Sequence, residues 1–149
     1  MQSIRREYYA EARLYKVHHQ HFANWCIHSI TVPAEFFSFV LLAQYFGLDA
    51  VVCLAISGII AAYYLLIPCP ASSAAAYGVV LTSWWSVVVY DYLRPPQVWI
   101  LALVVQFIAW CLQVVVGHYM IEQNSPAMGK RLTANSVVLS FLLAWDYSS

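Results

Sequence analysis

The sequence predicts an all-α, polytopic membrane protein, a bundle of four membrane-spanning helices followed by a short fifth apolar segment. The chain has 149 residues, of which 62% are hydrophobic and only 9% charged, whereas soluble domains carry about 25% charged residues. Its apolar residues gather in long runs separated by prolines, glycines and charges. A chain of this length forms one domain, residues 1–149, and one small soluble domain cannot hide so much apolar surface from water.

The chain begins with a polar segment and then alternates apolar runs with short connectors. Residues 1–23 are polar, charged and aromatic, and predict a short helix in water or along the membrane interface. Gly47 and Asp49 predict a tight turn after the first span, and the prolines in segment 68–73 predict a loop after the second. The expected spans cover about residues 25–46, 50–67, 74–92 and 98–121.

The last apolar segment, residues 132–145, is short for a span, because about 20 residues are needed to cross the hydrocarbon core. It either crosses obliquely, re-enters the membrane or packs as a half-helix, and the sequence leaves these alternatives open.

The basic residues predict the orientation. Six of the seven lie before the first span or after the fourth, namely Arg5, Arg6, Arg13, Lys16, Lys130 and Arg131. Because the four spans alternate in direction, both regions lie on one side of the membrane, and the excess of positive charge predicts that this side is cytoplasmic. The formal net charge is zero, so the chain has no basic face for nucleic acid.

All five histidines are expected on that same side, although they are far apart in the sequence. They are His18, His19, His21 and His28 at the start of the first span and His118 at the end of the fourth. Histidines scattered at random would have no reason to gather in this way. The pattern therefore indicates one polar, ionisable pocket, provided that the first and fourth spans pack together.

Helical spacing supports this pocket, because residues four apart share a face. Asn24 and His28 form one such pair, and His118 and Glu122 form another. Ionisable groups at membrane depth cost on the order of a few kcal/mol each, and they survive where they line a cavity or bind something. Imidazoles with a carboxylate suit a divalent transition metal such as iron, zinc or copper. Glu122 is then either a ligand or an outer acceptor that orients a ligating imidazole.

Other residues beside the pocket carry interpretations of their own. Gly117 would let another backbone or a substrate approach closely. Pro33 either frees a backbone carbonyl near the pocket or simply kinks the helix. Glu35 lies seven residues past His28, on the same face but deeper, and either binds a substrate group or pairs within the bundle. Tyr15 precedes the histidines closely enough to touch them.

These two clusters resemble the signatures of the fungal 2-hydroxy-palmitic acid dioxygenase family. The first signature is matched by Tyr15, His19, Asn24, His28 and Pro33. The second is matched by Gly117, His118, Glu122, Pro126 and Ala127. The order, the spacing and the apolar spans between the two signatures all fit, and the resemblance covers nearly the whole chain.

The resemblance implies an Fe(II)-dependent, multi-pass enzyme of the endoplasmic reticulum membrane. Such an enzyme shortens a 2-hydroxy fatty acid by one carbon with O2, in the α-oxidation route that degrades phytosphingosine. The signature histidines would carry the iron, which assigns that role to His19, His28 and His118. His18 and His21 are further candidate ligands, and the adjacency of His18 to His19 leaves the ligand register open by one residue.

The other signature residues would support the iron site. Glu122 and Asn24 would orient its ligands, and Tyr15 completes the set of candidate catalytic residues. The family often has arginines between the glutamate and the proline, where this chain has segment 123–125, Gln-Asn-Ser. If those arginines bind the substrate carboxylate, Lys130 or Arg131 would have to take their place.

Two alternatives remain beside the oxygenase. The chain could be a non-enzymatic scaffold or lipid-binding protein whose histidines merely face the interface. It could also be a haem protein with His28 and His118 as axial ligands. A di-iron desaturase is disfavoured, because the chain has only five histidines and lacks repeated histidine boxes.

Overall fold

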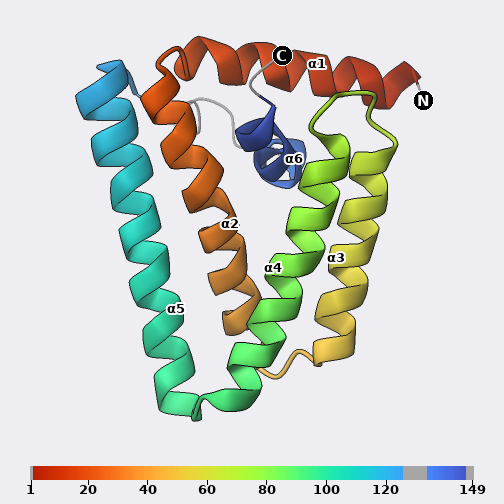
Figure 1. Cartoon of the computed structure of the whole chain (residues 1–149), viewed down its shortest axis with the longest axis vertical. Helices are drawn as coiled ribbons and strands as arrows, with labels where there is room; N and C mark the ends of the chain where they lie inside the picture. Colours follow the sequence, from red (N-terminus) through yellow and green to blue (C-terminus); the bar gives the residue numbers. More distant parts are fainter. Residues whose placement is uncertain (1, 126–133, 147–149) are drawn as a thin grey trace.

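The computed structural model describes residues 2–125 and 134–146, and within these ranges the protein contains helices and no strands (Figure 1). The all-α prediction is therefore confirmed. The helices are α1 (Gln2–His18), α2 (Phe22–Tyr45), α3 (Ala50–Leu65), α4 (Ser72–Tyr92), α5 (Pro95–Trp110), the π-helix η1 (Cys111–Glu122), which continues α5, and α6 (Ala134–Trp145).

Three of these helices are long and apolar enough to cross a membrane, namely α2, α4 and the continuous helix α5–η1. Helix α3 has 16 residues, which at 1.5 Å per residue makes it about 24 Å long, shorter than a hydrocarbon core of about 30 Å. It is also shorter than the span expected over 50–67, since the chain turns at Leu66 and Ile67 before Pro68. Figure 1 shows α3 alongside α4.

The apolar segment at the end of the chain forms a short helix inside the bundle. Helix α6 has 12 residues and is about 18 Å long, too short to cross a bilayer. It packs against α1, α2 and α4, in the half of the bundle nearest α1 (Figure 1). Of the alternatives left open by the sequence, the packed half-helix is the one observed; residues 132 and 133 lie outside the described ranges.

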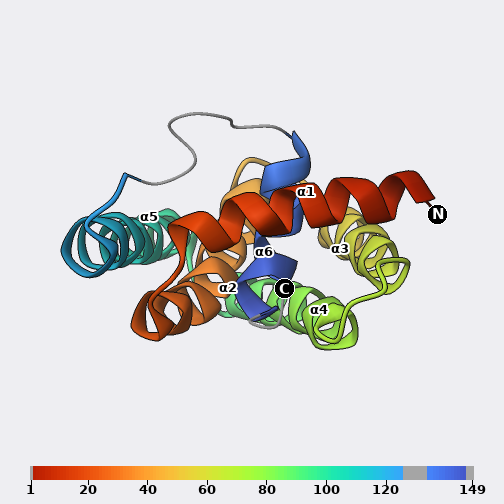
Figure 2. The same ribbon diagram turned by 90° about the horizontal axis from the view of Figure 1, so that it is seen from above.

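Helix α1 lies across one end of the bundle, as Figures 1 and 2 show. It is amphipathic, with Tyr8, Ala12 and His18 buried and its arginines exposed, which is the pattern of a helix with one face on a core. The hydroxyl of Tyr8 donates to the carboxylate of Asp146, next to the end of α6. The expected short helix is observed as a cap over the bundle, and its place in water or along the membrane interface stays a prediction.

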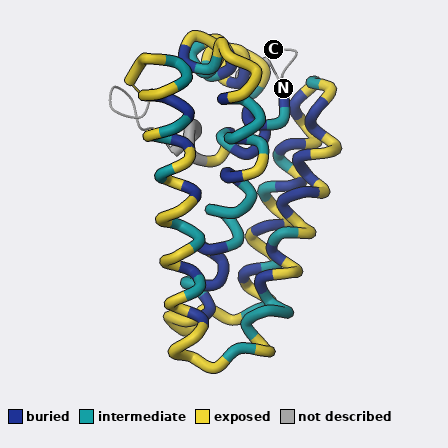
Figure 3. The backbone as a smooth tube through the Cα atoms, turned by 60° about the vertical axis from the view of Figure 1, so that its left-hand side comes forward, coloured by how far each residue is buried: buried dark blue, intermediate teal, exposed yellow. Residues whose placement is uncertain are grey.

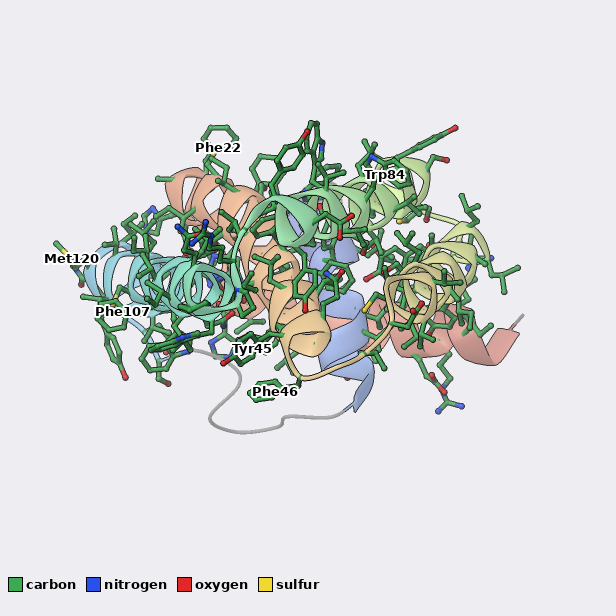
Figure 4. The ribbon with its side chains drawn as sticks, turned by 90° about the horizontal axis from the view of Figure 1, so that it is seen from below. Phe22, Tyr45, Phe46, Trp84, Phe107 and Met120 are labelled. Carbon is green, nitrogen blue, oxygen red and sulfur yellow. The ribbon has the colours of Figure 1, made fainter. Side chains whose placement is uncertain are left out.

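The side chains that face away from the bundle are largely apolar. The turns at the end opposite α1 are exposed (Figure 3). The large exposed side chains labelled in Figure 4 are Phe22, Tyr45, Phe46, Trp84, Phe107 and Met120. Lipid is the solvent in which such a surface is stable, because it does not penalise exposed apolar atoms.

The chain turns before α3 at Gly47 and Asp49, as the sequence predicts. Gly47 has a φ of 95°, a left-handed conformation that glycine adopts without steric cost. Two residues later the carboxylate of Asp49 accepts a hydrogen bond of 2.7 Å from the backbone N–H of Val51, which caps the first turn of α3.

Pro33 leaves a backbone carbonyl of α2 free to bond with α6. A proline has no N–H, so the carbonyl of Ser29, four residues earlier, loses its helical partner. The indole Nε1 of Trp145 donates to that carbonyl at 3.0 Å. The hydroxyl of Ser29 in turn donates to the carbonyl of Ala144 at 2.7 Å. The freed carbonyl inferred from the sequence is therefore present, and it is where the end of α6 docks on α2.

Candidate metal centre

Three histidines from different parts of the chain come together at the end of the bundle that α1 covers. They are His19 between α1 and α2, His28 in α2 and His118 in η1, and one ring nitrogen of each lies within 4.8 Å of the others. Their ring centroids are 4.3 to 5.2 Å apart, and the rings are nearly perpendicular to one another. The first and fourth spans do pack together, through contacts of α2 with α5 and η1.

The π-helix determines which residues of η1 face α2. A π-helix bonds residues five apart, and such segments are frequent at functional sites. Gln113 and His118 are five residues apart, and both are buried, as is Gly117. The π-helical turn therefore directs a glutamine and a histidine to the same side. Residues five apart do not share a face of an α-helix, so the α-helical spacing expected for the fourth span does not predict this pairing.

Backbone carbonyls orient two of the imidazoles. Nδ1 of His19 lies 2.8 Å from the carbonyl oxygen of Tyr15, and Nδ1 of His28 lies 3.1 Å from that of Asn24. A carbonyl oxygen only accepts, so both Nδ1 atoms carry the proton and both Nε2 lone pairs are free for a ligand.

Burial keeps His19 neutral. It lowers the pKa of His19 to about 2, mainly because the charged imidazolium would lose its water, and the nearby His28 lowers the pKa further. The hydrogen bond to the Tyr15 carbonyl acts in the opposite direction but is outweighed. A neutral imidazole is the form that binds metals.

Hydrogen bonds of Glu122 join the end of η1 to the start of α2. Its Oε1 accepts a hydrogen bond of 3.1 Å from the side-chain amide of Asn24 and one of 2.8 Å from the backbone N–H of His21. The carboxylate is outside the group of three close histidines. Neither bond involves an imidazole, so Glu122 joins α2 to η1 in this structure, and its role as a ligand or as an outer acceptor that orients an imidazole stays a prediction.

Gly117 allows the two helices to approach. A Cβ atom at this position would overlap Oδ1 of Asn24, which is completely buried. The expected close approach is observed, and within the described residues the group that approaches is the side chain of Asn24.

The imidazoles fit a metal because they carry buried nitrogen atoms with nothing to bind. Nε2 of His19 and Nδ1 of His118 have no hydrogen-bond partner within the described part of the chain. Buried polar atoms are rarely left unpaired, and a metal ion would satisfy imidazole nitrogens at this distance. Three imidazole nitrogens held this close together suit divalent iron, zinc or copper.

The other two histidines stand apart from this group. The imidazole of His21 is exposed, and the residue reaches Glu122 only through its backbone, because it occupies the N-cap of α2. His18 is buried and close enough to interact electrostatically with His19 and His118. It does not belong to the group of three. Of the adjacent residues His18 and His19, the geometry therefore favours His19 as the metal ligand.

Tyr15 stacks on His19, with ring centroids 3.7 Å apart and planes within 7°. Its hydroxyl is buried and has no hydrogen-bond partner among residues 2–125 and 134–146. Burial raises the pKa of the Tyr15 hydroxyl, so it keeps its proton. The phenol is therefore a free donor beside the three imidazoles.

The second signature is described only up to Ser125. η1 ends at Glu122, and Gln123, which has a left-handed φ of 53°, caps it by donating its N–H to the His118 carbonyl. Pro126 and Ala127 lie outside the described residues, and so do Lys130 and Arg131.

The comparisons with known proteins agree with the signatures. The sequence model of a family described as "2-hydroxy-palmitic acid dioxygenase Mpo1-like" matches residues 5–148, nearly the whole chain. No curated protein and no solved structure matches significantly. The family match includes all three clustered histidines and the residues that orient them.

Proposed function

Because the chain belongs to the 2-hydroxy-palmitic acid dioxygenase Mpo1-like family, we propose that it is an Fe(II)-dependent dioxygenase that shortens 2-hydroxy fatty acids by one carbon. O2 is the second substrate, and the reaction belongs to the α-oxidation that degrades phytosphingosine. One observation carries the proposal, the convergence of one ring nitrogen each from His19, His28 and His118 within 4.8 Å. These three residues would hold the iron.

Iron bound here would supply a Lewis acid and the redox chemistry that O2 requires. The residues of the chain do the positioning. The carbonyls of Tyr15 and Asn24 fix the orientation of two imidazoles, and Glu122 holds α2 against η1. The buried hydroxyl of Tyr15 has no partner in the described residues and can donate to an oxygen of the bound acid.

The position of the centre suits a substrate with a polar head and an apolar tail. His19 directly follows α1, and His28 and His118 gather with it, so the centre lies near the end of the bundle that α1 crosses (Figure 1). The head of a fatty acid enters from the interface, while its tail stays among helices and lipid. Lys130 and Arg131 are the basic residues proposed to bind the carboxylate, because the segment after Glu122 has none before Lys130.

For the location we propose the endoplasmic reticulum membrane, with the N-terminus in the cytoplasm. The support for this orientation is the excess of basic residues before α2 and after η1, six of the seven in the chain, since cytoplasmic segments are enriched in lysine and arginine.

The test is anaerobic reconstitution of the purified protein with Fe(II), followed by O2 consumption with 2-hydroxy acids of several chain lengths. We expect stoichiometric iron and O2 uptake that requires the 2-hydroxyl group, so the matched unhydroxylated acids serve as controls. His118→Ala should lose both iron and turnover while still inserting into membranes. Full activity of purified His118→Ala would exclude the proposed site.

The same preparation separates the alternatives. A scaffold or lipid-binding protein would carry no stoichiometric iron and would consume no O2. A haem protein would show a Soret band. The geometry favours neither alternative, because the buried nitrogens converge as a group of three rather than as a facing pair.

A further inference from the structure

The arginines and the lysine of α1 lie together on one exposed side of the helix. With Tyr9, which is also exposed, we define this basic face by its residues, Arg5, Arg6, Tyr9, Arg13 and Lys16. At 3.6 residues per turn they occupy an arc of about 100° around the helix axis. Glu7 and Glu11 lie at least about 100° outside this arc, so α1 separates its positive charges from its negative ones.

The basic face lies along the flank of α1. The helix turns Tyr8 and Ala12 towards the core of the bundle, and Arg5 is only about 20° around the axis from Ala12. The arc therefore begins beside the buried side of the helix and continues outward. Side chains in such an arc can reach groups that surround the end of the bundle.

Tyr9 holds two of the guanidinium groups. Nε of Arg13 donates a hydrogen bond of 3.2 Å to the carbonyl of Tyr9, and the guanidinium carbon of Arg5 lies 5.6 Å from the centre of the Tyr9 ring. Neither contact uses the terminal N–H groups, which form the fork that binds a phosphate or a carboxylate through two parallel hydrogen bonds.

The orientation of the protein in a membrane does not require this arrangement. Cytoplasmic segments are enriched in lysine and arginine by their number, whichever side of a helix these residues occupy. A helix with water alone on its outer side gains nothing by collecting four positive charges, because like charges on neighbouring turns repel each other. The separation of charges indicates a negatively charged partner beside the basic face.

The place of α1 indicates which partner this is. Figures 1 and 2 show α1 across one end of the long helices, and α2, α4 and α5–η1 are apolar enough to cross a membrane. In the membrane proposed above, α1 then lies at the level of the lipid head groups of one leaflet. The exposed ring of Tyr9 suits this level, where tyrosines are enriched.

We propose that the basic face of α1 binds phospholipids of net negative charge through the anionic groups of their heads. The cytoplasmic leaflet carries such lipids, and each lysine or arginine near its surface strengthens binding by about fivefold. A zwitterionic head carries a cation beside its phosphate and gains less from four basic residues. The inference rests on α1 and on the proposed membrane, and it requires neither iron nor turnover.

The test uses the purified whole protein in bilayers of phosphatidylcholine that contain a trace of spin-labelled lipid. The label is carried by phosphatidylcholine, by phosphatidylserine or by stearic acid, and electron spin resonance separates lipid held at the protein from free lipid. We expect phosphatidylserine to associate about fivefold more strongly than phosphatidylcholine. The advantage should fall as salt is raised from about 0.1 to 1 M, because the screening length shortens from about 10 to 3 Å.

Two double variants test the basic face itself. Arg5→Gln with Arg13→Gln should lose most of the advantage, whereas Arg5→Lys with Arg13→Lys keeps the charge and should retain it. Both side chains are exposed, so neither exchange disturbs the core. Four of the six basic residues expected on that side of the membrane remain, which preserves the orientation.

Equal association of phosphatidylserine and phosphatidylcholine would overturn the proposal. An advantage that the double glutamine variant keeps in full would also overturn it, because another surface would then bind the lipid. A preference for stearic acid without one for phosphatidylserine would assign the basic face to a fatty acid instead. Loss of the proposed dioxygenase activity would leave this inference standing, since each measurement is made without iron.

Discussion

The seam between α3 and α4 and the seam between α2 and η1 differ in how completely their buried polar groups are paired. Between α3 and α4, the hydroxyls of Ser57 and Ser83 lie 2.5 Å apart, and that of Ser57 is 2.8 Å from the carbonyl of Cys53. Both serines are buried and both are satisfied. Small hydroxylated residues of this kind let membrane helices approach closely and bond to each other.

Beside the seam between α2 and η1, in contrast, two imidazole nitrogens are left unpaired. Nε2 of His19, just before α2, and Nδ1 of His118 are buried without partners in the described residues, whereas the described side chains of α3 and α4 include no such atom. Both seams belong to one bundle, so the solvent does not explain the difference. Packing accounts for the paired hydroxyls of the α3–α4 seam, whereas the unpaired imidazole nitrogens beside the α2–η1 seam fit the proposed metal site.

The largest expected effect is on metal affinity. His19→Ala removes a ligand, and we expect affinity for Fe(II) to fall by more than about 100-fold, because the loss of an outer partner alone costs 10 to 100-fold. Competition with a chelator measures it. Ser57→Ala, in the α3–α4 seam, should leave affinity unchanged.

His21→Ala is the closer control for this prediction, because its imidazole is exposed and only two positions away. It should bind iron as the wild type does. An equal loss in both histidine variants would mean that the ligand set extends beyond the three clustered residues.

Two glycines, one at the contact of α2 with η1 and one on the exposed face of α3, sharpen the comparison. Gly117→Ala would push a Cβ into Asn24, and overpacking of this kind lowers the free energy of unfolding by up to about 3 kcal/mol. It should also weaken metal binding, since Asn24 donates to Glu122. Thermal unfolding in detergent, with and without Fe(II), measures both effects.

Gly58→Ala in α3 is the matched control. Nothing lies within 4 Å of a Cβ built there, and alanine is favoured over glycine in a helix by about 1 kcal/mol. We expect unchanged or higher stability and unchanged metal affinity. Similar destabilisation by both alanines would contradict the close approach of α2 and η1 at Gly117.

The sequence predicted the positions of the helices better than the side-chain contacts between them. Apolar runs and prolines place spans reliably, because lipid requires long apolar helices. The gathering of the histidines followed from alternating spans and the spacing of two motifs. The separation of His21 from His19 did not follow, because it depends on the turn between α1 and α2, where one residue caps a helix and the other stacks on Tyr15.

The π-helix could not be predicted from the sequence either. Its effect is to bring Gln113 to the face of His118, and no composition rule distinguishes segment 111–122 from the α-helix before it. The one available signal was a glutamine five residues before a histidine in an otherwise apolar run, opposite Glu35. Such a signal gains meaning only once α2 and η1 are known to be in contact.

The smallest expected effect concerns the contact of α6 with α2. Trp145→Phe keeps the ring but removes the donor to the Ser29 carbonyl, which Pro33 has already deprived of its helical partner. An acceptor left unpaired inside the bundle should lower the free energy of unfolding by about 1 kcal/mol. Pro33→Ala restores an N–H four residues after Ser29, so the double variant should lose less stability than Trp145→Phe loses alone. A double-mutant cycle by thermal unfolding measures this coupling, and strict additivity would show that the indole does not serve the carbonyl freed by Pro33.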